Sequence, residues 1–372
     1  MYQKGRAWIE LNMEHLSHNV AQFQKLLPQG CALMPAIKAN AYGHGASLIG
    51  RALWHMGICD FCVASVSEAI ELRKAGISGQ ILILGYTSPL QFADLANYRL
   101  TQTIVDFDYA KQLNDFGKQI CVHVGIDTGM HRLGERSENI EAIFQIWKLK
   151  HITVTGVFSH LCVSDSSSAT DRKFTLNQIA KFQSVVDALH SKGIHGFKTH
   201  MQGSYGVLNY PGLQFDYARI GIALYGTYSD SCDATVARVD LKPVLSLKSR
   251  IECIRPLYPG ESIGYGLTFT ADKKMRIAAV SIGYADGIPR SLSNKGYALA
   301  NGKKAPIIGR VCMDQLLIDV SELSEISSGD EVIFIGKCAN QEILASDMAE
   351  CADTISNEIL SRLGSRLERV AV

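Results

Sequence analysis

The feature that most constrains the fold is a regular alternation of short apolar runs and amphipathic segments over residues 1–240. The runs are typical of buried strands, and the segments between them have apolar residues at helical spacing. The runs end near Lys38, Ser65, Gly85, Asp106, Asp127, His160, Ser204 and Gly221. The helical segments include residues 67–75, 89–98, 109–118, 137–150 and 172–192. Eight strand–helix units in a chain of this length predict a TIM (β/α)8 barrel.

A different pattern follows residue 240. Strand-like segments recur without long helices between them, at residues 244–254, 276–283, 305–311, 315–320 and 330–335, and a final helix is expected near residues 344–363. Such spacing is typical of a separate, mostly β domain. We therefore predict a barrel over residues 1–240 and a C-terminal β domain over residues 241–372. The strand at residues 6–11 precedes the barrel pattern, and its assignment to either domain stays open.

Composition limits the class of protein. The 372 residues are 47% hydrophobic and 20% charged, which suits a large core, and the net charge of +1 without a basic run argues against nucleic acid as a partner. We expect a small-molecule ligand. Five of the ten cysteines lie in apolar stretches and are interpreted as reduced core residues, which favours a cytoplasmic setting: Cys31, Cys62, Cys121, Cys162 and Cys312. No apolar run is long enough to span a bilayer, so this segment is expected to make no membrane contact.

The stretch at residues 36–45, Ala-Ile-Lys-Ala-Asn-Ala-Tyr-Gly-His-Gly, carries the first candidate for chemistry. Lys38 follows an apolar run and precedes a turn marked by Gly43 and Gly45, which puts it at the C-terminal end of the first barrel strand. Catalytic groups of TIM barrels lie at that end of the strands. A partly desolvated amine there is favoured in its neutral form, which can attack an aldehyde to form a Schiff base.

Small residues near the last two barrel strands predict an anion site. The sequence Gln202-Gly-Ser204 follows the seventh strand, and residues 218–226 run along the eighth. Small residues let backbone N–H groups approach an anion closely, and Ser204 adds a hydroxyl donor. Phosphate groups commonly bind at this place in TIM barrels. The predicted amine and the predicted phosphate site therefore share one barrel mouth.

These motifs stand in the order found in one family. With residues 36–45 and 219–226, the segments 127–134 (Asp-Thr-Gly-Met-His-Arg-Leu-Gly), 262–266, 283–287 and 309–315 make nearly the whole chain resemble the alanine racemase family. The resemblance implies a fold type III enzyme with pyridoxal phosphate bound to Lys38. It also implies a homodimer with shared active sites that acts on a small-molecule amino acid.

The resemblance also implies roles for individual residues. Lys38 and Tyr265 would be the two catalytic bases, with His160 bridging toward Arg219 to help Tyr265. The cofactor-binding residues would be Lys38, Tyr42, Leu84, His160, Ser204, Arg219, Gly221 and Ile222. The substrate-binding residues would be Arg132, Met313 through its backbone, Tyr284 and Asn357.

Two positions depart from the family pattern. Gly125 stands where many members carry a carbamylated lysine, so the negative partner of Arg132 stays open between an anion and a water. Asn357 stands where alanine racemases usually place a tyrosine that narrows the pocket beside the substrate methyl group. An amide is smaller and offers both a donor and an acceptor, which suits the hydroxymethyl group of serine. In this respect the chain resembles the racemase domain of the serine racemases associated with vancomycin resistance.

The resemblance thus implies racemisation of serine and also of alanine, which supplies D-amino acids for peptidoglycan precursors. A plain alanine racemase is the alternative if Asn357 reflects neutral drift. A non-catalytic pyridoxal phosphate homeostasis protein would end after the barrel and would not use Tyr265, and a decarboxylase of related fold would favour an acidic residue in place of Arg219. Since such serine racemases carry an N-terminal membrane domain, we expect a cytoplasmic protein or the cytoplasmic domain of a membrane-anchored one.

Overall fold

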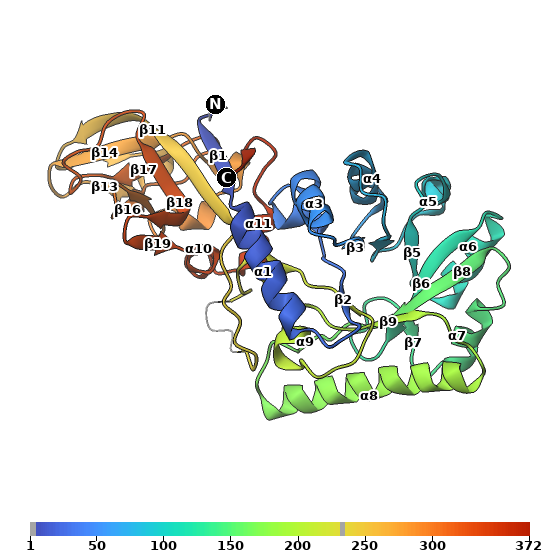
Figure 1. Cartoon of the computed structure of the whole chain (residues 1–372). Coiled ribbons are helices and arrows are strands. Elements are labelled where there is room, and N and C mark those ends of the chain that lie inside the picture. Colours follow the sequence, from blue (N-terminus) through green and yellow to red (C-terminus); the bar gives the residue numbers. More distant parts are fainter. Residues whose placement is uncertain (1–4, 231–234) are drawn as a thin grey trace.

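A parallel barrel forms the larger part of the chain in a computed structural model that describes residues 5–230 and 235–372 (Figure 1). Its strands are β2 (Ala32–Leu33), β3 (Phe61–Val63), β4 (Ile81–Ile83), β5 (Thr101–Ile104), β6 (Ile120–Asp127), β8 (Ile152–Phe158), β9 (Lys198–His200) and β10 (Tyr217–Ala218). They pair in the order β2-β10-β9-β8-β6-β5-β4-β3. A parallel bridge between Ala36 and Cys62 joins the two ends of this order. The prediction of an eight-stranded barrel is confirmed.

Helices cover the outside of the barrel. They are α3 (Ala46–His55), α4 (Val66–Lys74), α5 (Phe92–Asn97), α6 (Phe107–Asp115), α7 (Ile140–Ile146), α8 (Ala169–Ser191) and α9 (Ser204–Asn209). Several begin where the sequence provides a capping side chain: Ser65, Asp106 and Ser168 each accept a hydrogen bond from the N–H three residues ahead. The short strands therefore end at sites fixed by local sequence, and their carboxyl ends gather at one mouth.

The second part is the predicted β domain. Its sheet has the order β19-β18-β15-β16-β17-β14-β11-β1-β20. The bounds are β1 (Ala7–Leu11), β11 (Leu245–Leu257), β14 (Met275–Val280), β15 (Tyr297–Ala300), β16 (Lys303–Ile308), β17 (Leu316–Asp319), β18 (Glu331–Cys338), β19 (Gln341–Ile343) and β20 (Glu368–Ala371). A hairpin of β12 (Ser262–Ile263) and β13 (Phe269–Thr270) stands apart from this sheet.

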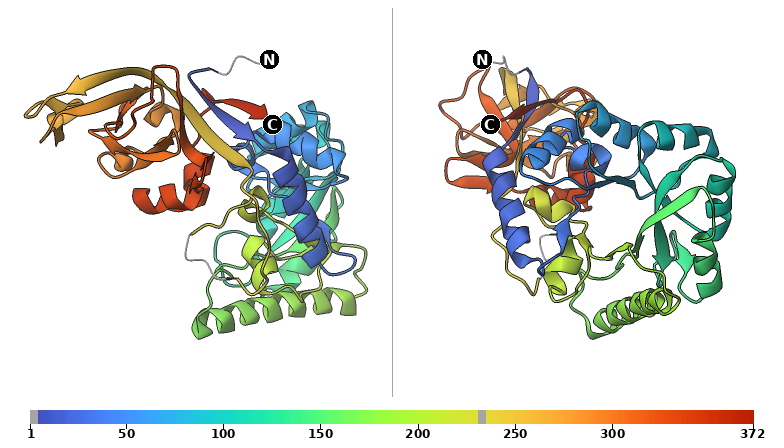
Figure 2. Two further views of the ribbon diagram at one scale, coloured as in Figure 1. Left: turned by 60° about the vertical axis from the view of Figure 1, so that its left-hand side comes forward. Right: turned by 45° about the vertical axis from the view of Figure 1, so that its right-hand side comes forward.

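The strand near the N-terminus lies in this second sheet. β1 is antiparallel to β11, with Ile9 opposite Leu247, and parallel to β20. Helix α1 (Met13–Leu26) then leads from the β domain into the barrel, and Figure 2 shows it running from the β domain along the barrel. The chain therefore starts in one sheet, builds the barrel, and returns to that sheet.

The C-terminal helical region differs from the single helix expected over residues 344–363, and that expectation is wrong. It consists of α10 (Ala345–Ala352) and α11 (Ser356–Ser361), because Asp353 adopts a left-handed conformation with φ of 58° and ends α10. Helix α11 lies tightly against the lysine motif: a Cβ atom at Gly43 would be 1.9 Å from the carbonyl oxygen of Leu360. This contact brings the segment that bears Asn357 to the barrel mouth.

The cysteines only partly match the expectation of a core role. The nine within the described residues are free, and among them Cys62 is buried whereas Cys121 is exposed. The prediction is therefore wrong for Cys121, whose strand turns that side chain away from the barrel interior. In the described parts of the chain, no helix has the length and apolar character needed to cross a membrane.

Candidate active site

A cavity of about 430 Å³ opens at the carboxyl ends of the barrel strands. It brings together ten of the predicted site residues: Lys38, Tyr42, Leu84, Arg132, His160, Ser204, Arg219, Gly221, Ile222 and Asn357. Three others lie in the β domain and do not line it. They are Tyr265, Tyr284 and Met313, whose exposed fractions are 71%, 42% and 52%. Their side chains are thus free to contact a second molecule.

Lys38 begins a turn with an unusual backbone. Helix α2 (Lys38–Tyr42) contains four successive residues, from Ala39 to Tyr42, with φ between 51° and 54°. A left-handed helical conformation costs L-residues roughly 1–2 kcal/mol each, so the surrounding structure must hold it. Glu68 accepts hydrogen bonds from the N–H groups of Ala39 and Ala64, both at 2.7 Å. The strain is concentrated beside the amine.

Two further side chains hold this turn. The Nδ1 atom of His44 contacts the carbonyl oxygens of Ala41 at 3.0 Å and Tyr42 at 2.9 Å, which requires Nδ1 to carry the proton. Arg369, from β20, donates from Nε to the carbonyl oxygen of Gly43 at 2.8 Å. The last strand of the β domain therefore helps to fix the lysine turn of the barrel.

His44 predicts an acid sensitivity of the fold. Its ring is buried against Tyr225 at a centroid distance of 4.4 Å, its Nε2 has no hydrogen-bond partner among the described residues, and burial lowers its pKa to about 4. In the unfolded chain, His44 binds a proton near pH 6.5. The stability that neutral His44 gives to the folded state is therefore fully present above that pH and is lost as the pH falls toward 4.

The expected loss from His44 is about 1.4 kcal/mol of unfolding free energy per pH unit in this window. Denaturant unfolding of His44→Gln, followed from pH 7 to pH 4, should show a shallower pH dependence than the wild type. His55→Gln removes an exposed histidine and serves as the control. Parallel curves for wild type and His44→Gln would contradict this assignment.

Arg219 is the buried cation of the cavity. Its guanidinium donates to the carbonyl oxygens of Ser159 at 2.8 Å and Met201 at 3.2 Å. It also contacts Nδ1 of His200 at 2.5 Å and Nδ1 of His160 at 3.2 Å. Burial lowers the pKa of Arg219 to about 10, so it stays charged at neutral pH. Burial, aided by Arg219, lowers the pKa of His160 to about 3, so this imidazole is neutral.

Sequence reasoning missed a polar chain behind Arg219. Since Arg219 donates to Nδ1 of His200, that ring carries its proton on Nε2, which lies 2.8 Å from Nδ1 of His123. Nε2 of His123 contacts the amide of Gln80 at 2.7 Å. A Cβ atom at Gly156 would lie 2.6 Å from the His123 ring, so glycine makes room for it. The signal was a histidine among the valines of β6, but only the fold aligns it with His200.

The phosphate end of the cavity is built from small groups. Oγ of Ser204 accepts hydrogen bonds from the backbone N–H groups of Gly221 at 3.1 Å and Ala223 at 3.3 Å. A Cβ atom at Gly221 would lie 2.6 Å from the hydroxyl of Tyr42, so a larger residue would fill this space. A cradle of N–H and hydroxyl groups near a lysine amine and a buried arginine fits pyridoxal phosphate, which has an anion, an aldehyde and a ring nitrogen.

Arg132 and Asn357 also line the cavity. Asp127 fixes the turn before Arg132 by accepting hydrogen bonds from the N–H groups of Gly129 at 2.9 Å and His131 at 3.0 Å. The Oδ1 atom of Asn357 is buried and has no hydrogen-bond partner among the described residues. An orphaned buried acceptor costs stability unless a ligand supplies a donor. The fold and this cavity define a class of barrel proteins that bind pyridoxal phosphate through a lysine.

Comparisons with known proteins give the family. Residues 11–229 match the family model "Alanine racemase, N-terminal domain", and residues 244–371 match "Alanine racemase, C-terminal domain". The chain belongs to the alanine racemase family, whose members depend on pyridoxal phosphate.

Individual relatives are similar over nearly the whole chain. A serine/alanine racemase of Enterococcus gallinarum is 41% identical over 97% of this chain and 51% of that protein. An alanine racemase of Carboxydothermus hydrogenoformans is 39% identical over 98% of this chain and 99% of that protein. The solved alanine racemase of Clostridium difficile 630 is 34% identical, with a TM-score of 0.92 over 99% of this chain and 96% of that one. The chain spans about half the length of the Enterococcus relatives it matches.

Proposed function

We propose that this chain is a pyridoxal phosphate-dependent racemase that interconverts L- and D-serine and also L- and D-alanine, supplying D-amino acids for peptidoglycan precursors. The observation that carries the choice of serine is Asn357, which lines the same cavity as Lys38 and whose buried Oδ1 has no hydrogen-bond partner among the described residues. The hydroxyl group of serine can donate a hydrogen bond to this oxygen. The similarity to the serine/alanine racemase of Enterococcus gallinarum supports the same choice.

Eight residues would hold the cofactor. Lys38 would bind it covalently, and Arg219 would interact with its ring nitrogen. Its phosphate group would be held by Tyr42, Ser204, Gly221 and Ile222, and Leu84 and His160 would complete the site. When bound, the cofactor withdraws electron density from the α-carbon of the amino acid, which makes the C–H proton acidic.

Arg219 sets the electronic character of the site. Its pKa of about 10 leaves the guanidinium charged at neutral pH, and its contacts with Ser159, Met201 and His200 fix its plane. With the cofactor bound, this charged guanidinium would leave the ring nitrogen unprotonated, which would favour racemisation over transamination.

Racemisation needs a proton acceptor on each face of the α-carbon. Lys38 serves one face, and Tyr265 of the partner subunit serves the other. A tyrosine hydroxyl is a weak base at neutral pH, so it needs a donor that stabilises the phenolate. His160 accepts from Arg219 on Nδ1 and is neutral, so it carries its proton on Nε2 and donates it toward Tyr265.

The substrate carboxylate would be bound from both chains. Arg132 comes from the barrel, and the Met313 N–H and Tyr284 come from the partner subunit. The exposure of Tyr265, Tyr284 and Met313 on the β domain supports a homodimer that shares its active sites. Gly125 adds no charge beside Arg132, so we assign the negative partner of this arginine to a bound anion or to the oxygen of a water molecule.

The selectivity of the site gives a prediction for Asn357→Tyr. A tyrosine ring at this position would exclude the hydroxyl of serine, and the amide hydrogen bond that Asn357 offers is worth about fivefold. We expect kcat/KM for L-serine to fall by at least that factor while kcat/KM for L-alanine is unchanged or rises. Formation of each D-amino acid, measured with a D-amino-acid oxidase, gives both values.

Asn357→Asp is the matched variant, since it keeps the size and the acceptor but adds a charge. Equal losses on both substrates in Asn357→Tyr would show that Asn357 supports the fold or the cofactor rather than the choice of substrate. A plain alanine racemase would then be the better proposal, and the full-length match to the Carboxydothermus hydrogenoformans alanine racemase favours that alternative.

A further inference from the structure

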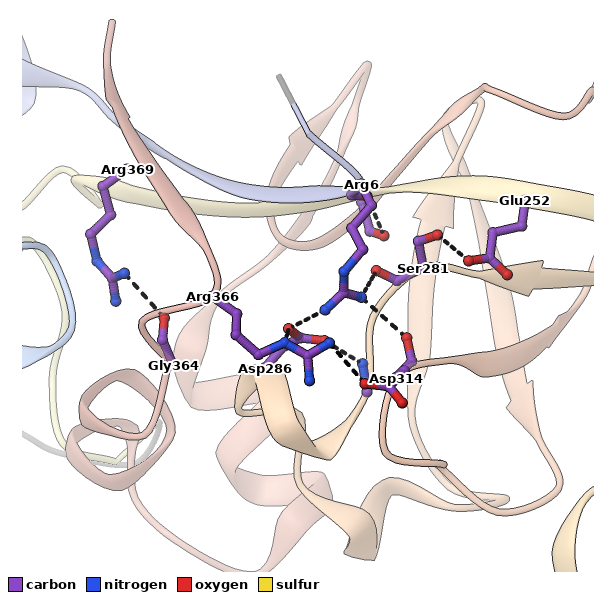
Figure 3. A network of polar contacts seen from close by, with 10 residues as sticks. Arg6, Glu252, Ser281, Asp286, Asp314, Gly364, Arg366 and Arg369 are labelled. Atoms are coloured by element: carbon purple, nitrogen blue, oxygen red, sulfur yellow. Dashed lines mark hydrogen bonds and ion pairs between the residues drawn. The ribbon is translucent and has the colours of Figure 1, made fainter. Parts of the chain in front are cut away.

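We propose that Asp286 is a positioning residue for the surface that this chain lends to the active site of its partner. Figure 3 shows its carboxylate shared between Arg6 and Arg366. We infer that this pairing fixes the two segments that carry Tyr284 and Met313. The inference rests on the shared site proposed above.

The carboxylate of Asp286 is fully buried and has charged partners from both ends of the chain. Its Oδ1 lies 2.6 Å from a guanidinium nitrogen of Arg6 and 3.4 Å from Nε of Arg366. Its Oδ2 accepts a hydrogen bond from the N–H of Gly283 at 3.0 Å. A buried carboxylate is stable only when paired in this way, and neutralising it removes the ion pair with Arg6 and weakens the contact with Arg366.

The two segments that the carboxylate anchors lie directly against each other. The N–H of Tyr284 donates to the carbonyl oxygen of Cys312 at 2.9 Å, and the N–H of Ala285 donates to that of Met313 at 3.0 Å. A Cβ atom at Gly283 would lie 2.4 Å from the Met313 oxygen. A shift of the segment 283–286 must therefore carry residues 312–313 with it.

The same two arginines also hold the second segment. Arg6 donates to the carbonyl oxygen of Asp314 at 3.2 Å, and Arg366 donates to its carboxylate at 2.8 Å. Gly364 adds a backbone bond to the carbonyl oxygen of Asp286 at 2.9 Å. Asp286 thus lies at the centre of a network that leaves the Tyr284 and Met313 side chains exposed while their backbones are fixed.

The test uses dimers in which only one active site is intact. In a hybrid of a Lys38→Ala chain with a Tyr265→Ala chain, the working site takes its barrel from the Tyr265→Ala chain and its β-domain groups from the Lys38→Ala chain. Asp286→Asn placed on the Lys38→Ala chain should raise KM for L-serine by about tenfold, because a charge-assisted anchor is lost. The same substitution on the Tyr265→Ala chain should leave KM unchanged.

Two further variants serve as an alternative and a control. Arg366→Gln is the alternative if Asp286→Asn does not fold, because it removes a half-exposed partner of Asp286. It should raise KM when placed on the Lys38→Ala chain and leave KM unchanged when placed on the Tyr265→Ala chain. Asp319→Asn removes a carboxylate that, among the described residues, accepts hydrogen bonds from the neighbouring Ser321, and it should leave KM unchanged in either chain.

Equal losses from both placements of Asp286→Asn, or no change from either, would overturn the positioning role while the shared site stands. A parent hybrid without activity would overturn the shared site itself and this inference with it.

Discussion

Replacing Lys38 with alanine is expected to lower racemisation of serine and alanine by roughly 10⁴-fold or more, because one residue supplies both the covalent attachment and a base. Among the described residues that line the cavity, Lys38 provides the one amine, and the guanidinium groups of Arg132 and Arg219 cannot replace it. Borohydride reduction of wild-type holoenzyme, followed by peptide mass spectrometry, should find the phosphopyridoxyl group on Lys38.

Lys150→Ala, which removes an exposed surface lysine, is the control and should keep full activity. Retention of the activity by Lys38→Ala, or a phosphopyridoxyl group on another lysine, would contradict the assignment.

Mixing inactive Lys38→Ala with inactive Tyr265→Ala should restore about a quarter of the wild-type activity. With random exchange, half of the dimers are hybrids, and each hybrid has one of its two sites intact. The physical reason is that Lys38 lies in the barrel cavity, whereas Tyr265 lies exposed on the β domain. Two different affinity tags, used in sequence, would isolate the hybrids. Pure hybrid dimers that are inactive would rule out a site shared between subunits.

The barrel was predictable because its units are local. Each strand is a short apolar run, and several helices begin at a nearby cap such as Ser65 or Asp106. The place of β1 in the second sheet was not predictable, because Ala7 pairs with Ser249 and the partner strand lies far along the sequence. The break in the C-terminal helical region depends on the left-handed backbone of Asp353, a conformation that sequence periodicity does not reveal.

The candidate site shows the same division. Residues at strand ends, such as Lys38 and Arg219, could be placed at one mouth because parallel strands share a direction. The left-handed turn after Lys38 could not be predicted, since Glu68 and Arg369 hold it from distant parts of the chain. The roles of Tyr265 and Met313 came from the family resemblance, because a single chain keeps them outside the cavity.

The most direct test of the central claim is to incubate the purified holoenzyme separately with L-serine and L-alanine and to measure the D-isomers with a D-amino-acid oxidase. The account predicts that both D-amino acids form, that each reaction also runs from the D-isomer, and that Asn357→Tyr selectively lowers the serine rate. Formation of D-alanine without D-serine would contradict the serine assignment, and formation of neither would contradict the racemase itself.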